Sequence, residues 1–191
     1  MAIIAYRDTQ YAIAKGGNMR KLSGLKPQDI YILLKIVSMD GKPWRTTDLA
    51  SELFISQSEV SSALFRARYA RLVDDNKRLV FRESLLELLV HGVKYVFPQQ
   101  PGAVVRGIPT AHSAPPLSKL IRSAQTIYVW RDDEGTTRGE EIEPLYSSVP
   151  RAVKRDPALY ELLALVDAMR VGKPRERELA AKELGRRILR K

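Results

Sequence analysis

The spacing of apolar residues predicts a first helix that begins near Pro27 and ends near Met39. Its apolar positions recur three and four residues apart, which places them on one face: Ile30, Leu33, Leu34 and Val37. Proline is favoured in a first helical turn. The run Asp-Gly-Lys-Pro after residue 39 is a typical end signal. This segment is therefore expected to pack one face against a core.

Two further helices are predicted over residues 47–53 and from residue 57 to about residue 71. Thr46 is the expected N-cap of the first. Ser56 and Glu59 form the pattern of a capping box for the second, in which each side chain bonds the backbone amide of the other residue. The inner face of the second helix is predicted to contain Val60, Ala63, Leu64 and Ala67.

Residues 72–82 alternate in polarity around a polar turn and predict a small β-hairpin. A fourth helix is predicted over residues 84–97. It is apolar on more than one side, so it must be buried in its own core or against a partner.

The second half of the chain changes character. Residues 98–118 contain five prolines and a single charge, Arg106, which predicts a proline-rich linker or loop. Residues 125–130 have the composition of a strand, residues 132–139 that of a turn, and helices are predicted over residues 157–171 and 175–190. Residues 1–21 are expected to be a flexible arm or an added strand.

These elements predict a fold that is mainly α with a small β component. The expected organisation is an N-terminal helical domain over residues 22–97, the linker, and a mostly helical C-terminal region over residues 119–191 with one short β-hairpin.

The charge of the chain directs attention to a polyanionic partner. The sequence has 32 Lys and Arg against 22 Asp and Glu, a net charge of +10, and the two halves, residues 1–97 and 98–191, carry +5 each. Such a surplus favours nucleic acid. Residues 170–191 hold nine of the basic residues against three Glu. The simpler interpretation of that helix is a solvated face with Glu–Arg pairs.

The order helix, helix, turn, helix, hairpin, with the run LASEL followed by SQSEVSSAL, resembles the winged helix-turn-helix domain of MarR-like bacterial transcriptional regulators. The resemblance covers about residues 25–82 and is carried by Leu49, Ala50, Leu53, Ser56, Val60, Ser61 and Leu64. Phe54 stands where that family commonly has Gly. Because Phe rarely adopts a positive φ, a slightly different turn is expected.

The resemblance implies sequence-specific binding to double-stranded DNA by a homodimer, with the helix at about residues 57–71 in the major groove. The physical chemistry agrees, since amide and hydroxyl side chains read base edges and Arg or Lys neutralise phosphates. The predicted DNA-binding residues are Gln57, Ser58, Ser61, Ser62, Arg66, Arg68, Lys77 and Arg78. Asp74 and Asp75 at the hairpin tip are unfavourable for that role.

An alternative is an antitoxin-like or adaptor protein that binds a partner protein through its C-terminal half, with DNA binding autoregulatory or absent. The uncharged segment over residues 110–117 and the basic last helix would then form the docking surface. The dimer interface would come from the fourth helix or from the helices within residues 157–190.

Several classes are not expected from this sequence. No set of residues suggests a nucleophile with its base, so an enzyme is not predicted, and neither a cofactor nor a metal is. His91 is expected to be a buried, hydrogen-bonded side chain rather than a metal ligand with His112 and Glu87. The absence of cysteine excludes disulfides, and no apolar run is long enough for a membrane helix. The first six residues are too short for a signal peptide, so a cytoplasmic location is expected.

Overall fold

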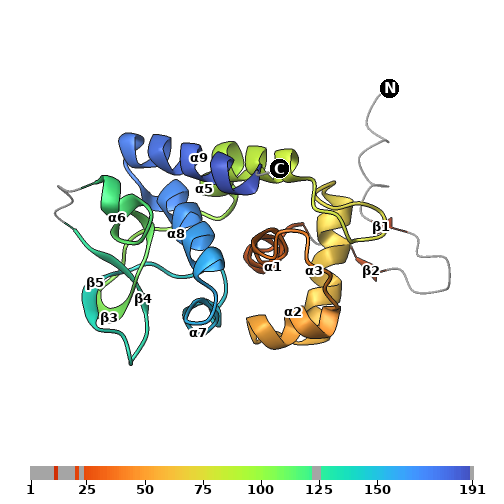
Figure 1. Cartoon of the computed structure of the whole chain (residues 1–191), viewed down its shortest axis with the longest axis horizontal. Helices are drawn as coiled ribbons and strands as arrows, with labels where there is room; N and C mark the ends of the chain where they lie inside the picture. The colour runs from red at the N-terminus through yellow and green to blue at the C-terminus, as the bar shows by residue number, and fades with distance from the viewer. Residues whose placement is uncertain (1–10, 13–19, 22–23, 122–125, 190–191) are drawn as a thin grey trace, which may run out of the picture.

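A computed structural model describes residues 11–12, 20–21, 24–121 and 126–189. It is mainly helical, with a small three-stranded sheet at one end. Figure 1 shows α1, α2 and α3 in one half of the molecule, the sheet at the opposite end, and α7 and α8 between them. Most of the predicted arm over residues 1–21 lies outside the described residues. Within it, β1 (Tyr11–Ala12) pairs antiparallel with β2 (Arg20–Lys21).

The three helices predicted from apolar spacing are confirmed. They are α1 (Pro27–Ser38), α2 (Thr46–Leu53) and α3 (Gln57–Tyr69). Two ends differ from the prediction, because Arg45 rather than Thr46 is the N-cap of α2, and α3 ends two residues earlier than expected. The predicted inner face of α3 is buried at all four positions.

The predicted fourth helix is continuous but contains a π-helical turn. It comprises α4 (Arg82–Glu87), η2 (Leu88–Gly92) and α5 (Val93–Val96). Its buried face follows positions four residues apart: Leu85, Leu89, Val93 and Phe97. His91 lies off this face and is exposed, so the prediction of a buried histidine is wrong. Apolar residues on several sides of the helix concealed which side faces the core.

The sheet contains β3 (Val104–Pro109), β4 (Tyr128–Arg131) and β5 (Thr137–Glu141), closed into a three-stranded barrel. β3 pairs antiparallel with both other strands, while β4 and β5 are parallel to each other. Two predictions are therefore wrong. Residues 98–118 are not a linker throughout, since they contribute β3, and β4 and β5 do not form a hairpin because they are parallel.

Three glycines make this small barrel possible, among them Gly139 in β5, where a Cβ atom would overlap the Ile127 carbonyl oxygen. A Cβ atom at Gly107 would overlap the carbonyl oxygen of Trp130, and one at Gly135 would overlap the backbone of Gly107 itself. The strands and their connection approach each other more closely than any side chain allows. Glycine is required here for proximity rather than for an unusual φ.

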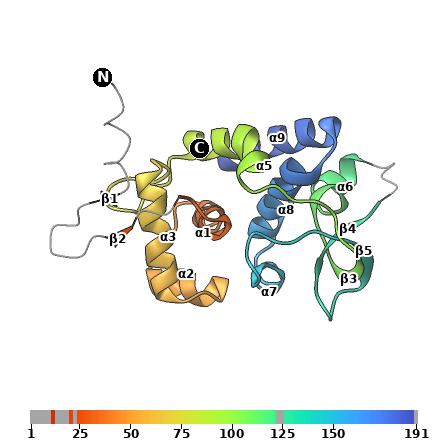
Figure 2. The ribbon, with the colours of Figure 1, turned by 180° about the vertical axis from the view of Figure 1, so that it is seen from behind.

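The remaining helices join the two halves into one core. They are η3 (Ala111–Ser113), α6 (Leu117–Leu120), α7 (Val149–Val153), α8 (Pro157–Val171) and α9 (Pro174–Ile188). α8 packs against both α1 and α9, and its buried residues belong to the same continuous cluster as those of α1 and α3. Figure 2 shows α9 and α5 along the same edge of the molecule, away from α2 and α7.

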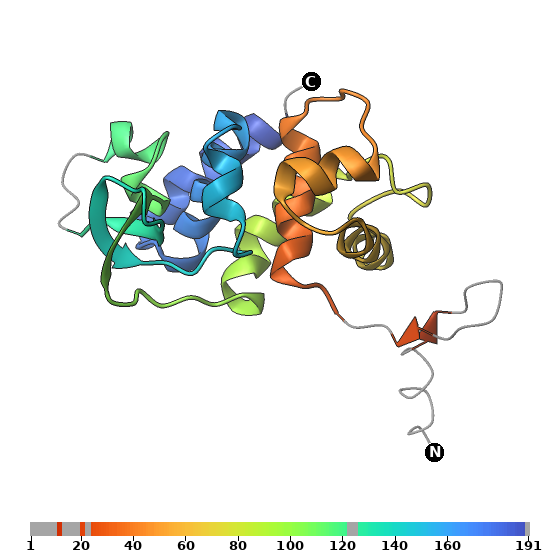
Figure 3. The same ribbon diagram turned by 90° about the horizontal axis from the view of Figure 1, so that it is seen from below.

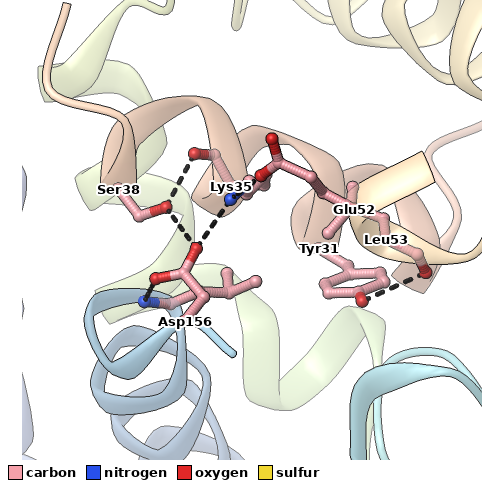
Figure 4. A network of polar contacts seen from close by, with 7 residues as sticks. Tyr31, Lys35, Ser38, Glu52, Leu53 and Asp156 are labelled. Atoms are coloured by element: carbon pink, nitrogen blue, oxygen red, sulfur yellow. Dashed lines mark hydrogen bonds and ion pairs between the residues drawn. The ribbon is translucent and has the colours of Figure 1, made fainter. Parts of the chain in front are cut away.

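A polar junction fixes α1 to the other half of the molecule (Figure 4). The Lys35 ammonium lies 2.7 Å from Asp156 Oδ2 and 2.5 Å from Glu52 Oε2. Asp156 also caps α8, because its Oδ1 accepts a hydrogen bond of 2.9 Å from the Leu159 amide. Burial alone would lower the pKa of Lys35, but the bonds to the two carboxylates outweigh it and raise that pKa. Burial opposes ionisation of Asp156 too, yet Lys35 and the Leu159 amide lower its pKa.

Candidate nucleic-acid interface

The N-terminal end of α3 presents small polar side chains on a fixed frame. The Glu59 amide donates to Ser56 Oγ at 3.2 Å, and the Ser56 amide donates to Glu59 Oε2 at 3.4 Å, so the predicted capping box is confirmed. Gln57, Ser58 and Ser61 are exposed, and Ser62 is half-buried. Because the opposite face of α3 is buried, these side chains are held in one orientation toward solvent.

The structure assigns a different role to Arg66. Its Nε donates to Asp29 Oδ2 at 2.8 Å and its Nη2 to Asp29 Oδ1 at 2.6 Å, a bidentate pair between α3 and α1. The Asp29 side chain is fully buried and that of Arg66 is 10% exposed. A guanidinium that forms a buried bidentate pair is not available to bind a phosphate, so we remove Arg66 from the predicted DNA-binding residues. Arg68 is exposed, with its guanidinium 5.6 Å from the Phe65 ring centroid.

The turn between α2 and α3 adopts the conformation that we expected Phe54 to avoid. Phe54 has φ 56° and ψ 46°, in the left-handed region. The guanidinium of Arg151 lies 3.8 Å from the centroid of the Phe54 ring, and Ser148 Oγ donates to the Leu53 carbonyl at 2.6 Å. Contacts from α7 therefore hold a strained residue in place.

The predicted hairpin over residues 72–82 is reduced to a single β-bridge between Val73 and Val80. Its tip is organised by Asp74, whose Oδ1 accepts from the amides of Arg78 at 2.6 Å and Leu79 at 2.8 Å. These backbone hydrogen bonds, the one from Leu79 first, lower the pKa of Asp74. Asp74, which the sequence predicted to be unfavourable for DNA binding at the tip, is thus the residue that shapes the tip.

The two cations of the hairpin lie against aromatic rings. The Lys77 ammonium is 5.7 Å from the Phe65 ring centroid, on the same ring as Arg68. Arg78 lies 4.9 Å from the Trp44 ring centroid and donates to the Trp44 carbonyl at 2.8 Å. Aromatic contacts thereby order long side chains that would otherwise sample many rotamers.

An open groove of about 720 Å³ separates the hairpin from the loop that precedes α2. Four cations line it, together with Trp44 and Asp48: Lys42, Arg45, Arg78 and Arg82. The sequence pattern missed Lys42, Trp44 and Arg45, since residues 40–45 were interpreted only as a helix end. The sequence did contain a signal for these residues, namely an aromatic residue with a basic residue on each side in a short loop.

Three cations of the basic C-terminal helix α9 form ion pairs within the molecule. Lys182 pairs with Glu178 at 2.7 Å, Arg186 with Glu183 at 2.8 Å, and Arg187 with Glu161 at 2.8 Å. The interpretation of a solvated face with Glu–Arg pairs therefore describes α9 better than a phosphate-binding surface does.

The uncharged segment over residues 110–117 also packs inward. Its buried members include Ala111, Ala114 and Leu117, and Thr110 Oγ1 donates to the buried Asp167 at 2.9 Å. Trp130 Nε1 donates to the same carboxylate oxygen at 2.6 Å, and Arg170 pairs with its other oxygen at 2.7 Å. The segment is an ordered part of the core.

Comparison of the chain with models of protein families, with curated proteins and with solved structures finds no match. Within the described part of the chain, none of the helices combines the length and apolarity needed to cross a bilayer.

Proposed function

We propose that the protein binds double-stranded DNA through a winged helix-turn-helix unit formed by α2, α3 and the hairpin. The N-terminal end of α3 enters the major groove, where Gln57, Ser58 and Ser61 contact base edges. The observation that carries the proposal is this row of exposed amide and hydroxyl side chains on a capped helix whose other face is buried.

The cations around α3 support the same proposal. Arg68 and Lys77 flank the Phe65 ring, and the groove beside Trp44 adds Lys42 and Arg45. Such cations neutralise phosphates on either side of the groove that the helix occupies. The adaptor hypothesis has less support, because the segment over residues 110–117 is packed and three cations of α9 are in ion pairs within the molecule.

A single module of this size buries too little surface for tight specific binding. We therefore propose that the protein acts as a homodimer on a palindromic site, as a transcriptional regulator. Light scattering of the free protein and of its complex with a duplex gives the stoichiometry directly. Two chains per duplex is the expected result, and one chain per duplex contradicts the dimer.

A binding titration on genomic duplex fragments, repeated at several salt concentrations, tests the function. We expect the logarithm of the affinity to fall linearly with the logarithm of salt concentration, by about 0.9 for each phosphate neutralised. An affinity that does not change with salt would exclude this mode of binding, as would a failure to retain any fragment at low salt.

A further inference from the structure

A second element lies beside the turn of the proposed reading unit. α7 comes from the far half of the chain, yet it is fastened to the end of α2 by the 2.6 Å hydrogen bond from Ser148 to Leu53. Two residues earlier in the chain, the Tyr146 hydroxyl lies 3.3 Å from both carboxylate oxygens of Glu59 in the first turn of α3. Figure 3, seen from below, shows α7 next to the end of α2, on the side of the molecule where α3 begins.

Two arginines, Arg151 in α7 and Arg155 just after its end, lie over the ring of Phe54 at the turn. The guanidinium of Arg151 is 3.8 Å, and that of Arg155 is 5.9 Å, from the centroid of the Phe54 ring. Both residues are exposed. Stacking uses the face of a guanidinium and leaves the N–H groups at its edge available for oxygen acceptors.

The electrostatic setting distinguishes these two arginines from their neighbours. Among the described residues, neither Arg151 nor Arg155 has a carboxylate partner within ion-pair distance, whereas Lys154 between them pairs with Asp132 at 2.9 Å and Glu134 at 2.7 Å. Lys154 thereby compensates part of the negative charge of the β4–β5 connection. The third acidic residue there, Asp133, lines the same hollow as Arg151 and Arg155 and has no ion-pair partner among the described residues.

We infer that α7 and the residues directly after it form a phosphate-binding clamp, in which Arg151 and Arg155 hold the DNA backbone beside the end of α2, while Lys77 and Arg78 of the hairpin hold other phosphates. This inference rests on the proposed function. It assigns to the C-terminal half a direct role in DNA binding, and it explains why aromatic Phe54 occupies the turn: the ring orients two guanidinium groups toward the nucleic acid.

The test is the salt dependence of binding to one duplex by the full chain carrying Arg151→Ala and Arg155→Ala. Loss of two phosphate contacts is expected to reduce the slope of log affinity against log salt by about 1.8, at about 0.9 per contact. The pair Arg151→Lys and Arg155→Lys keeps both charges and should retain most of the slope. Arg186→Ala, on α9, is the matched control and should leave the slope unchanged.

Two outcomes separate the inference from the proposed function. A wild-type slope retained by the double alanine variant would overturn the clamp and leave DNA binding by α3 intact. If the wild-type protein binds no duplex, both proposals fail together. Because Arg151→Ala removes the closer of the two contacts to the Phe54 ring, Arg155→Ala alone provides a second variant with a smaller effect on the turn. Its slope should fall by about 0.9 with little change in unfolding temperature, and an unchanged slope would contradict the role of Arg155.

Discussion

At the scale of single residues, the two arginines of α3 have opposite roles. Arg66 forms a buried pair with Asp29, whereas Arg68 is exposed beside an aromatic ring. Removing one partner of a buried pair costs about 3–5 kcal/mol, since the other charge is left unpaired. Arg66→Ala should therefore lower the free energy of unfolding by that amount. Arg68→Ala should change it by less than about 0.5 kcal/mol while weakening binding to DNA. Urea unfolding and a binding titration on both variants measure the contrast, and equal stabilities would refute it.

The pair Lys35–Asp156 predicts a pH dependence. Asp156 has a lowered pKa, so its stabilising contribution is present above the ordinary value of 3.8 and is lost as pH falls through the folded-state pKa. Lys35 has a raised pKa, so its contribution is present below 10.5 and is lost as pH rises through a still higher value.

Asp156→Asn tests the acid side, because Asn still caps a helix but carries no charge. It should cost about 1.5–3 kcal/mol near neutral pH, the range for hydrogen bonds to charged groups. The difference from wild type should shrink below the ordinary pKa of 3.8, where the wild-type carboxylate also becomes protonated. Urea unfolding across a pH series measures it, and a difference that is constant down to low pH would contradict the assignment.

At the scale of elements, the barrel depends on close approach at Gly107. Gly107→Ala places a methyl group against the carbonyl of Trp130, and backbone cannot move aside as a flexible side chain can. We expect the free energy of unfolding to fall by at least about 1–3 kcal/mol. Gly24→Ala is the control, since nothing lies within 4 Å of a Cβ there. Thermal unfolding of the two variants should differ clearly, and equal midpoints would mean that the strands are farther apart than described.

The elements that could be predicted from sequence are those specified by neighbouring residues. The 3.6-residue spacing of α1 and the capping box of α3 are local signals, and both are found as predicted. β3 could not be predicted because its partners lie 20 to 36 residues further along the chain and prolines surround it. The same holds for the candidate site. Helical periodicity predicted that Gln57 and Ser58 are exposed. It could not predict the pairing of Arg66 with a residue 37 positions away, nor the contact of Phe54 with α7.

At the scale of the whole molecule, the continuous core across α1, α3 and α8 predicts one cooperative unfolding transition. The chain has two tryptophans, and Trp130 is buried in the barrel. In a Trp44→Phe variant, fluorescence reports on the barrel alone, while far-UV circular dichroism reports mainly on the helices. The two urea midpoints should coincide. Separate transitions would mean that the two halves fold independently.

The central claim is that the N-terminal end of α3 reads DNA sequence. The most direct measurement selects a preferred duplex from a random pool and compares its affinity with that of a scrambled duplex, for wild type and for the double variant Gln57→Ala with Ser58→Ala. We expect the variant to lose about 1–3 kcal/mol of preference for each base contact removed, with little change in affinity for the scrambled duplex. A variant that retains the full preference would contradict the claim, because the sequence would then be read by another surface.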